Sequence, residues 1–329
     1  MLSLIIPVYN RPEEIRELLG SLAVQTDTDF EILIVEDGST LSCEDVVRAC
    51  SQALNLRYLT KTNSGPGLSR NAGAEQAGGD FFVFLDSDCV VPPGYVEAVK
   101  KGLERTGCDA FGGPDRAGED FDGMQKAVSY SMTSFFTTGG IRGGGEKMEK
   151  FHPRSFNMGV SRKAFQAVGG FSGMRYGEDI DFSIRLIRAG FRTVLLKDAW
   201  VCHKRRTDMK AFFRQVWHSG AARIELERRH PRSLRLVHTL PALFTLGSLL
   251  LLLAAVGCLA AATGPLAVGT ALSASLCCLG PLLLYALLIF VDSLLRNGPR
   301  VALLSVGTSF VQLWGYGCGF WAALLRRPL

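Results

Sequence analysis

The sequence Phe81-Phe82-Val83-Phe84-Leu85-Asp86-Ser87-Asp88 is the clearest indication of the fold. Its apolar part has aromatic and β-branched members and no helical period, which is typical of a strand buried on both faces. Open α/β sheets bind ligands just beyond the carboxyl ends of their strands. Because side chains two apart in extended backbone point the same way, both carboxylates can face one spot. Such a pair suits a hard divalent cation that also holds phosphates, although acidic and hydroxyl residues also form ordinary turns.

The chain on both sides of this stretch alternates between strands and helices. Strands are predicted at residues 2–6, 30–35, 56–59 and 191–196, with helices and short loops between them. This alternation predicts an α/β fold with a Rossmann-like, mostly parallel sheet. Residues 112–155 interrupt the rhythm with clustered glycines and no periodic pattern, so we expect a mobile loop there.

A βαβ unit at the start of a chain is typical of dinucleotide-binding proteins, so a dinucleotide site is considered first. Its fingerprint needs G-x-G-x-x-G between the first strand and its helix. That turn reads Pro7-Val8-Tyr9-Asn10, and the later Gly65-Pro66-Gly67 lacks the third glycine. The sequence therefore argues against an NAD enzyme.

The C-terminal third of the chain has the composition of a membrane domain. No Lys, Arg, Asp or Glu occurs in residues 236–291 or 301–325, and a span needs about 20 apolar residues. We expect helices near 239–262, 266–291 and 301–325; the alternative is a very apolar soluble core. A basic amphipathic segment at 206–235 precedes them, so the predicted parts are 1–205, 206–235 and 236–329.

Charge and cysteine content indicate which side of the membrane the first part occupies. Met1 leads directly into an apolar strand without a basic signal region. Several arginines precede the first predicted span. We expect a multi-pass protein of the plasma (inner) membrane with residues 1–205 on the cytoplasmic face. Arg326 and Arg327 fit this only if the third helix does not cross fully. The nine cysteines form no C-x-x-C pair, and the net charge of +5 suits anionic lipid better than nucleic acid.

An ordered set of short motifs resembles the family 2 glycosyltransferases of GT-A fold. The set consists of Pro7-Val8-Tyr9-Asn10, Glu36-Asp37-Gly38-Ser39, Gly67-Leu68-Ser69-Arg70-Asn71, Asp86-Ser87-Asp88, Asn157-Met158-Gly159-Val160-Ser161, Val168-Gly169-Gly170-Phe171 and Glu178-Asp179. Each motif is short, but their order and spacing are specific, and the resemblance covers about residues 1–205. Where this chain has Glu36, the family more often has Asp.

The resemblance implies a nucleotide-sugar donor and names the residues that would bind it. Asp37 would accept a hydrogen bond from the nucleobase, Tyr9 would pack on the base, and Arg70 would lie near the phosphates. The remaining nucleotide-binding positions that it implies are Pro7, Asn10, Asp86 and Ser87. The plainer alternatives are a turn at Asp37, strand-end packing for Tyr9 and a solvated helix face for Arg70.

The resemblance also implies a metal site and a catalytic base. Asp88 would be the principal ligand of Mg²⁺ or Mn²⁺, with Asp86 and His203 as further ligands. Asp179 would be the base of an inverting single displacement, and Glu178 would lie on the acceptor side. If the acceptor is a phosphate, no proton needs to be removed, and Asp179 would position or stabilise. Acidic residues also favour a helix N-terminus through its dipole.

These residues predict a metal-dependent glycosyltransferase that moves a single sugar to a membrane-associated acceptor, a lipid or a lipid-linked glycan. Processive relatives carry Gln-x-x-Arg-Trp near the membrane, whereas this chain reads Arg214-Gln215-Val216-Trp217-His218. Two alternatives stay open: a non-catalytic membrane-bound assembly partner with a degenerate transferase domain, and a nucleotidyltransferase. Donor sugar, nucleobase and acceptor cannot be read from the sequence.

Overall fold

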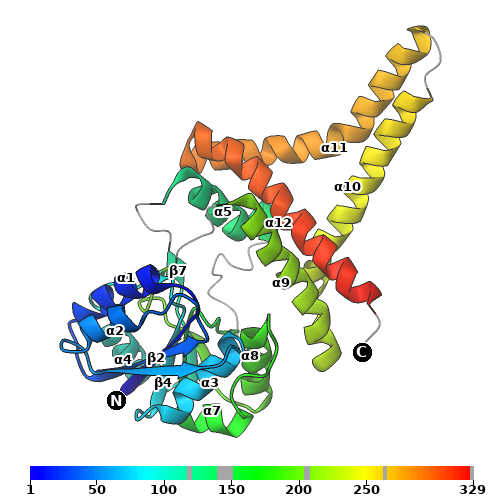
Figure 1. The fold of residues 1–329 in the computed structure, drawn as a ribbon. Coiled ribbons are helices and arrows are strands. Elements are labelled where there is room, and N and C mark those ends of the chain that lie inside the picture. The colour runs from blue at the N-terminus through cyan, green and yellow to red at the C-terminus, as the bar shows by residue number, and fades with distance from the viewer. Residues whose placement is uncertain (117–120, 139–150, 204–207, 262–264, 327–329) are drawn as a thin grey trace. The chain divides into compact units, whose positions relative to one another are not determined.

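The chain divides into two compact units, which are described one at a time. The computed structural model, drawn in Figure 1, describes residues 1–116, 121–138, 151–203, 208–261 and 265–326. The first unit, here the sheet unit, comprises Met1–Glu119 and Lys147–Lys204; the second, the helical unit, comprises Asp120–Glu146 and Arg205–Leu329. Residues 121–138, which the sequence grouped with 1–205, therefore cluster with the C-terminal helices.

The sheet unit is built on a seven-stranded sheet of order β3-β2-β1-β4-β8-β6-β9. Only β8 runs antiparallel to its neighbours, so the predicted mostly parallel α/β sheet is confirmed. A second, three-stranded sheet has the order β5-β10-β7. The strands are β1 (Leu2–Val8), β2 (Phe30–Asp37), β3 (Leu56–Lys61), β4 (Phe81–Leu85), β5 (Cys89–Val90), β6 (Ala110–Gly112), β7 (Asp115–Arg116), β8 (Asn157–Ser161), β9 (Thr193–Leu195) and β10 (Val201–His203).

Strand β4 is buried on both faces, as its unbroken apolar sequence predicts. Phe82 and Phe84 enter one hydrophobic cluster, whereas Val83 and Leu85 enter the other. All four are at most 1% exposed. Because a parallel sheet of this kind carries helices on both faces, each face of β4 contributes to a separate core.

Helices cover both faces of the large sheet. The clusters take apolar side chains from α1, α2 and α4 on one face and from α3, α7 and α8 on the other. The bounds are α1 (Pro12–Ala23), α2 (Glu44–Cys50), α3 (Pro66–Gln76), α4 (Tyr95–Thr106), α7 (Arg162–Val168) and α8 (Glu178–Arg188). Proline stands in the first turn of α1 and α3, where its missing N–H costs no hydrogen bond.

The helical unit contains two helices that the sequence did not predict. Within residues 112–155, α5 (Gly123–Thr133) and α6 (Phe135–Thr138) form where a loop was expected. Asp122 and Gln125 form a reciprocal capping box at the start of α5, and Val128 and Met132 bury its apolar side. The expectation of a loop was wrong for α5 and α6, and its 139–150 part lies outside the described residues.

The remaining helices of this unit follow the sequence closely. The basic amphipathic segment forms α9 (Met209–Arg229), and the three apolar helices are α10 (Leu236–Ala260), α11 (Pro265–Asn297) and α12 (Pro299–Leu325). All three are long and apolar enough to cross a membrane. Helix α11 ends later than expected, at Asn297, and its last turns carry an Asp292–Arg296 ion pair of 2.8 Å.

Candidate active site

The predicted site residues of the sheet unit gather at the carboxyl edge of β1, β2 and β4. These strands lie side by side in the sheet, so the segments after Val8, Asp37 and Leu85 emerge at one edge. Asp86 begins a tight turn in which its carbonyl oxygen accepts a hydrogen bond from the Cys89 amide at 3.1 Å. The turn leads into β5, whose partner strand β10 ends at His203.

Asp88 lies between an arginine and a histidine. The His203 Nε2 atom is 3.1 Å from Asp88 Oδ1, and the Arg11 guanidinium donates to Asp88 Oδ2. The β5–β10 register, which pairs His203 with Cys89, fixes this meeting, and the His203 ring also stacks on Phe156. Burial opposes ionisation of Asp88, but His203 and Arg11 outweigh burial and hold its pKa well below the usual range.

The donor atoms around Asp88 fit a divalent cation that accepts oxygen and nitrogen. Asp88, His203 and Cys89 offer ligand atoms within 4.8 Å of one another. The Cys89 thiol is unsuited, because it is buried and donates to the Phe156 carbonyl oxygen at 3.5 Å. Burial, with the Asp88 and Asp86 charges, raises the Cys89 pKa well above its usual value. A carboxylate with an imidazole suits Mn²⁺ better than Mg²⁺.

Arg70 joins Asp86 to the N-terminus of α8. Its Nη2 atom donates to Asp86 Oδ1 at 2.6 Å and its Nη1 atom to Glu178 Oε1 at 3.0 Å. The Arg70 side chain is only 2% exposed and lies over the Phe171 ring. The solvated helix face considered from the sequence is therefore wrong; Arg70 is an internal cation that positions two acids.

Glu178 and Asp179 begin α8 and have opposite pKa shifts. Asp179 Oδ2 lies 2.8 Å from Arg154 Nε, and Asp179 Oδ1 accepts from the Ile180 amide at 2.8 Å. Burial opposes ionisation of Asp179, but Arg154 and Arg70 outweigh it and lower its pKa. Burial and the neighbouring Asp179 charge raise the pKa of Glu178 to about 7, against the attraction of Arg70. At neutral pH Asp179 is therefore the ionised member of the pair.

The Asp37 carboxylate organises the loop that follows β3. It accepts hydrogen bonds from Lys61 Nζ at 2.6 Å, the Ser64 amide at 2.9 Å and the Gly65 amide at 2.8 Å. Neighbouring Glu36 turns toward α2, where it accepts from the Cys43 amide at 2.8 Å. The two acids of this motif thus act separately, and Asp37 alone faces the loop that leads into α3.

Asn10 and Tyr9 occupy the turn after β1. Asn10 has a φ of 54°, and its Oδ1 atom accepts from the Thr40 and Leu41 amides at 2.7 and 2.9 Å. A positive φ is several-fold commoner for Asn than for most residues, which explains the residue type. The Tyr9 side chain is 51% exposed, so its ring is accessible to a ligand. The roles of Tyr9, Asn10, Pro7 and Ser87 toward a nucleotide stay predictions.

Sequence reasoning missed three cations, Arg11, Lys61 and Arg154. Each pairs with one predicted carboxylate, Asp88, Asp37 and Asp179 respectively. Lys61 had a usable signal, since it ends β3 in register with Asp37 on β2. Arg11 and Arg154 had none, because no strand register pairs either of them with its carboxylate.

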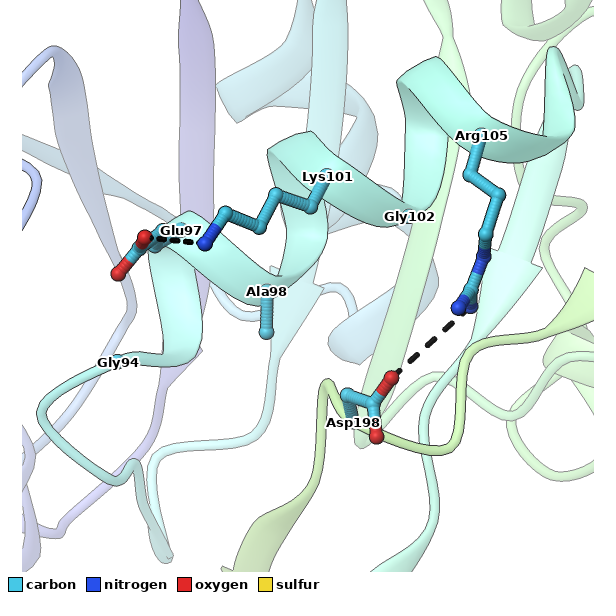
Figure 2. Close-up of a pocket in the computed structure, with 7 residues that line it drawn as sticks. All are labelled: Gly94, Glu97, Ala98, Lys101, Gly102, Arg105 and Asp198. Atoms are coloured by element: carbon cyan, nitrogen blue, oxygen red, sulfur yellow. Dashed lines mark ion pairs between the residues drawn. The ribbon is translucent and has the colours of Figure 1, made fainter.

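A hollow of about 310 Å³ lies elsewhere on the sheet unit, over α4 (Figure 2). It is edged by the ion pairs Glu97–Lys101 at 2.6 Å and Arg105–Asp198 at 3.9 Å. Three of these side chains are largely exposed and Glu97 is about half exposed, and none of the four is a predicted site residue. The strand-end carboxylates, not this hollow, form the candidate site.

Comparison with solved structures shows which fold this chain has. A mannosyltransferase from Pyrobaculum calidifontis, PcManGT in complex with GDP-Man and Mn²⁺, matches with a TM-score of 0.57 and 18% identity over 94% of this chain and 85% of that chain. Residues 1–349 of S. aureus TarS with UDP match with a TM-score of 0.50 and 20% identity, over 94% and 90%. The likeness is one of fold, and it is the GT-A fold of glycosyltransferases.

The chain belongs to glycosyl transferase family 2, whose family model matches residues 3–169, about half of the 329 residues. Glycosyltransferase AglE of Haloferax volcanii is 29% identical over 210 residues, which are 62% of this chain and 67% of AglE. An uncharacterized glycosyltransferase of Rickettsia felis is 40% identical over 102 residues, 31% of this chain and 17% of that protein. This chain thus corresponds to only a small part of the Rickettsia relative.

Proposed function

We propose that this glycosyltransferase transfers a single sugar from a nucleotide-sugar to a lipid or lipid-linked acceptor, with inversion and with a divalent cation. One observation carries the proposal: two acidic centres, Asp88 with His203 and Asp179 with Arg154, are linked through the buried Arg70. The partners of Arg70 are Asp86, two residues before Asp88, and Glu178, which directly precedes Asp179. The arrangement supports a donor side and an acceptor side in one site.

The donor side is assigned to Asp88 and the strand-end segments around it. Asp37 and Tyr9 would meet the nucleobase, while Arg11 and His203 offer positive or donor groups for the diphosphate. A divalent cation held by Asp88 and His203 would offset charge on the leaving nucleotide. The GDP-Man and Mn²⁺ in the similar P. calidifontis mannosyltransferase support a nucleotide-sugar and Mn²⁺ here.

The acceptor side is assigned to Asp179. An inverting transfer needs one base, which takes the proton of the acceptor hydroxyl while that oxygen attacks the anomeric carbon. Arg154 and Arg70 keep Asp179 ionised, so it can accept this proton without first losing one. For a phosphate acceptor no proton is removed, and Arg154, whose side chain is 39% exposed, would balance the phosphate charge.

The lipid acceptor and the membrane setting rest on the helical unit. Three of its helices are long and apolar enough to cross a membrane, which would hold the enzyme where lipid acceptors are concentrated. The arginines before α10 favour the cytoplasmic face of the plasma membrane for that end of the chain. Transfer to a detergent-dispersed lipid acceptor, but not to its soluble headgroup, would support this assignment.

Two substitutions in the full-length enzyme test the proposal, with Asp198→Asn as the control because that carboxylate is exposed. Asp179→Asn should retain nucleotide binding and lower turnover by about 100- to 10,000-fold. Asp88→Ala should abolish the stimulation by Mn²⁺ of both donor binding and turnover. Normal turnover of Asp179→Asn would sink the assignment of the base.

The released product separates the reaction classes. A sugar transfer releases a nucleoside diphosphate or monophosphate, whereas a nucleotidyltransferase releases pyrophosphate. Wild-type enzyme that binds nucleotide-sugars but neither transfers nor hydrolyses them would instead support a non-catalytic partner. A thermal-shift panel of nucleotide-sugars with Mn²⁺ would identify the donor, because ligands of the folded state raise its stability.

A further inference from the structure

Helix α12 differs from the other two apolar helices in how much of it the protein covers. In its most apolar stretch 44% of the residues are buried, against 17% for α10 and 11% for α11. A helix that crosses as part of a small bundle shows much of its circumference to lipid, as α10 and α11 can. The contacts of α12 within the helical unit explain the difference.

Helices α10 and α11 form an antiparallel hairpin whose levels can be read from its contacts. Near its base the Phe244 and Tyr285 rings are 5.3 Å apart, and nearer its tip Ser275 Oγ donates to the Ala255 carbonyl oxygen at 2.8 Å. A third crossing helix that starts at the base would pass both levels in turn. Its C-terminal part would then lie beside Ser275 and Ala255.

Helix α12 starts beside the base of the hairpin, as a third crossing helix would, but it does not continue toward the tip. Ser293 Oγ donates to Ser305 Oγ at 2.8 Å, and the Phe310 ring lies 5.5 Å from that of Tyr285. From Phe310 to Trp321 the helix extends about 16 Å, enough to reach the level of Ser275. Instead, Trp321 Nε1 donates to the Ala242 carbonyl oxygen at 3.0 Å.

The displacement of Trp321 is large on the scale of a membrane. Ala242 and Ala255 are thirteen residues apart on α10, which corresponds to about 20 Å along the helix, whereas the hydrocarbon core is about 30 Å thick. Trp314, between the two ends, also contacts α10, with Nε1 donating to Ser248 Oγ at 2.8 Å near the middle of that helix. Both halves of α12 therefore contact the half of the hairpin that lies away from its tip, and Figure 1 shows the tip projecting away from α12.

Helix α9 runs parallel to the C-terminal part of α12 at very short distance. A Cβ atom at Gly319 would overlap the Trp217 carbonyl oxygen, and one at Gly220 would overlap the Tyr316 carbonyl oxygen. Further along, Arg228 Nη2 donates to the Ala323 and Arg326 carbonyl oxygens, both at 2.9 Å. Small residues allow helix backbones to approach this closely, so α9 and α12 lie at one depth.

The charges of α9 then set that depth. Seven charged residues are spread along the helix: Lys210, Arg214, Arg223, Glu225, Glu227, Arg228 and Arg229. Each Lys or Arg at the centre of a membrane helix costs roughly 2.5–3.5 kcal/mol on the insertion scale. Helix α9 therefore lies at a membrane surface, and α12, joined to it from Trp217 to Arg228, lies there too.

The N-terminal part of α12 is held in the same way by α5. Thr308 Oγ1 donates to the Ala127 carbonyl oxygen at 3.0 Å, beside the charged Lys126 of α5. Tyr130 of α5 also donates to Asp292 Oδ2 at 2.7 Å, where α11 ends. Polar contacts thus accompany both ends of α12.

We infer that α12 does not cross the bilayer: it lies along one membrane face, across the base of the α10–α11 hairpin, with α9 and α5 against it. The hairpin is then the part of the chain that enters the bilayer. Both ends of the helical unit lie on the side of α9. Arg232, Arg235, Arg296, Arg300 and Arg326 all come to one side, which removes the conflict that three crossings create with the positive-inside rule.

The inference is tested on the full-length protein with a different epitope tag at each end. Sealed membrane vesicles of both orientations are treated with protease, and detergent-opened vesicles show that each tag can be cleaved. We expect the two tags to be lost together in one orientation and to be protected together in the other. Loss of one tag with protection of the other, in either orientation, would overturn the inference.

Discussion

Different interactions position the side chains at the edge of the sheet and the helices at the base of the hairpin. At the sheet edge, strand register brings carboxylates together, and buried or half-buried cations form ion pairs with them. In the helical unit, glycines bring backbones together, and charged side chains stay at the surface. Ion pairs therefore fix the positions of the site residues, whereas close backbone contacts fix the packing of α12. A substitution can weaken one kind of interaction without weakening the other.

The largest expected effect comes from removing the cation at the centre of the site. Arg70→Met leaves Asp86 and Glu178 without their shared partner, which should cost about 3–5 kcal/mol of unfolding free energy, as for other broken buried ion pairs. Thermal or denaturant unfolding of the purified protein measures this. Arg48→Met, which removes only an exposed helical pair with Glu44, is the control and should change little.

The next effect is a pH dependence that Glu178 introduces. Its pKa is raised from 4.5 to about 7 in the folded protein, so the folded state holds this proton more tightly than the unfolded state. The resulting stabilisation is complete below pH 4.5 and is lost as the pH rises through 7. Its full size is about 3 kcal/mol, since one pKa unit corresponds to about 1.4 kcal/mol.

Glu178→Gln isolates this contribution. Relative to wild type, the variant should gain stability when unfolding is measured at pH 8 instead of pH 5. Glu44→Gln, at an exposed carboxylate, is the control and should follow the wild type. A constant difference between Glu178→Gln and wild type across this range would show that Glu178 does not titrate as described.

Packing in the helical unit should give an effect of about 1–3 kcal/mol, typical of overpacking. Gly319→Leu forces a side chain against the Trp217 backbone, whereas a Cβ atom at Gly257 on α10 would meet nothing within 4 Å, so Gly257→Leu is the control. The first variant should lower the thermal unfolding midpoint of the detergent-solubilised protein and the second should not. Equal midpoints would mean that α9 and α12 are not closely packed.

The smallest effect concerns Arg11, which pairs with the acid proposed to hold the cation. Arg11→Ala removes a competing positive charge and should tighten the binding of Mn²⁺ alone by about fivefold, or about 1 kcal/mol. Calorimetric titration with MnCl₂ in the absence of nucleotide measures this. Arg16→Ala on the exposed side of α1 serves as control, and unchanged or weaker binding in Arg11→Ala would show that the two cations do not compete.

The sequence predicted the acids of the site better than their surroundings. The β4 run and the Asp86-Ser87-Asp88 turn could be read because a doubly buried strand has a distinctive composition. Arg11 and Arg154 could not, since their ion pairs depend on tertiary distances that no local pattern encodes. The approach of His203 to Asp88 followed from family resemblance, and its physical cause is the β5–β10 register.

In the membrane part, the sequence predicted helices but not their depth. Hydropathy counts apolar residues, so α10, α11 and α12 all qualified as spans. What distinguishes α12 is its partner helices, and the glycines that admit them, Gly315, Gly317 and Gly319, do not identify those partners. Helix α5 was missed because its capping box stands near glycine-rich sequence that favours a loop.

Because α5 belongs to the helical unit although it lies between two segments of the sheet unit in the sequence, truncation of this enzyme needs care. The backbone passes between the two units after residues 119, 146 and 204, so no single cut separates them. A protein ended at residue 205 would retain α5 but lose Phe212, Val216 and Val311, against which Val128 and Met132 are buried. Such a fragment would expose the apolar side of α5, which favours aggregation. Its poor solubility would then result from the loss of α9 and α12, not from a failure of the sheet unit to fold.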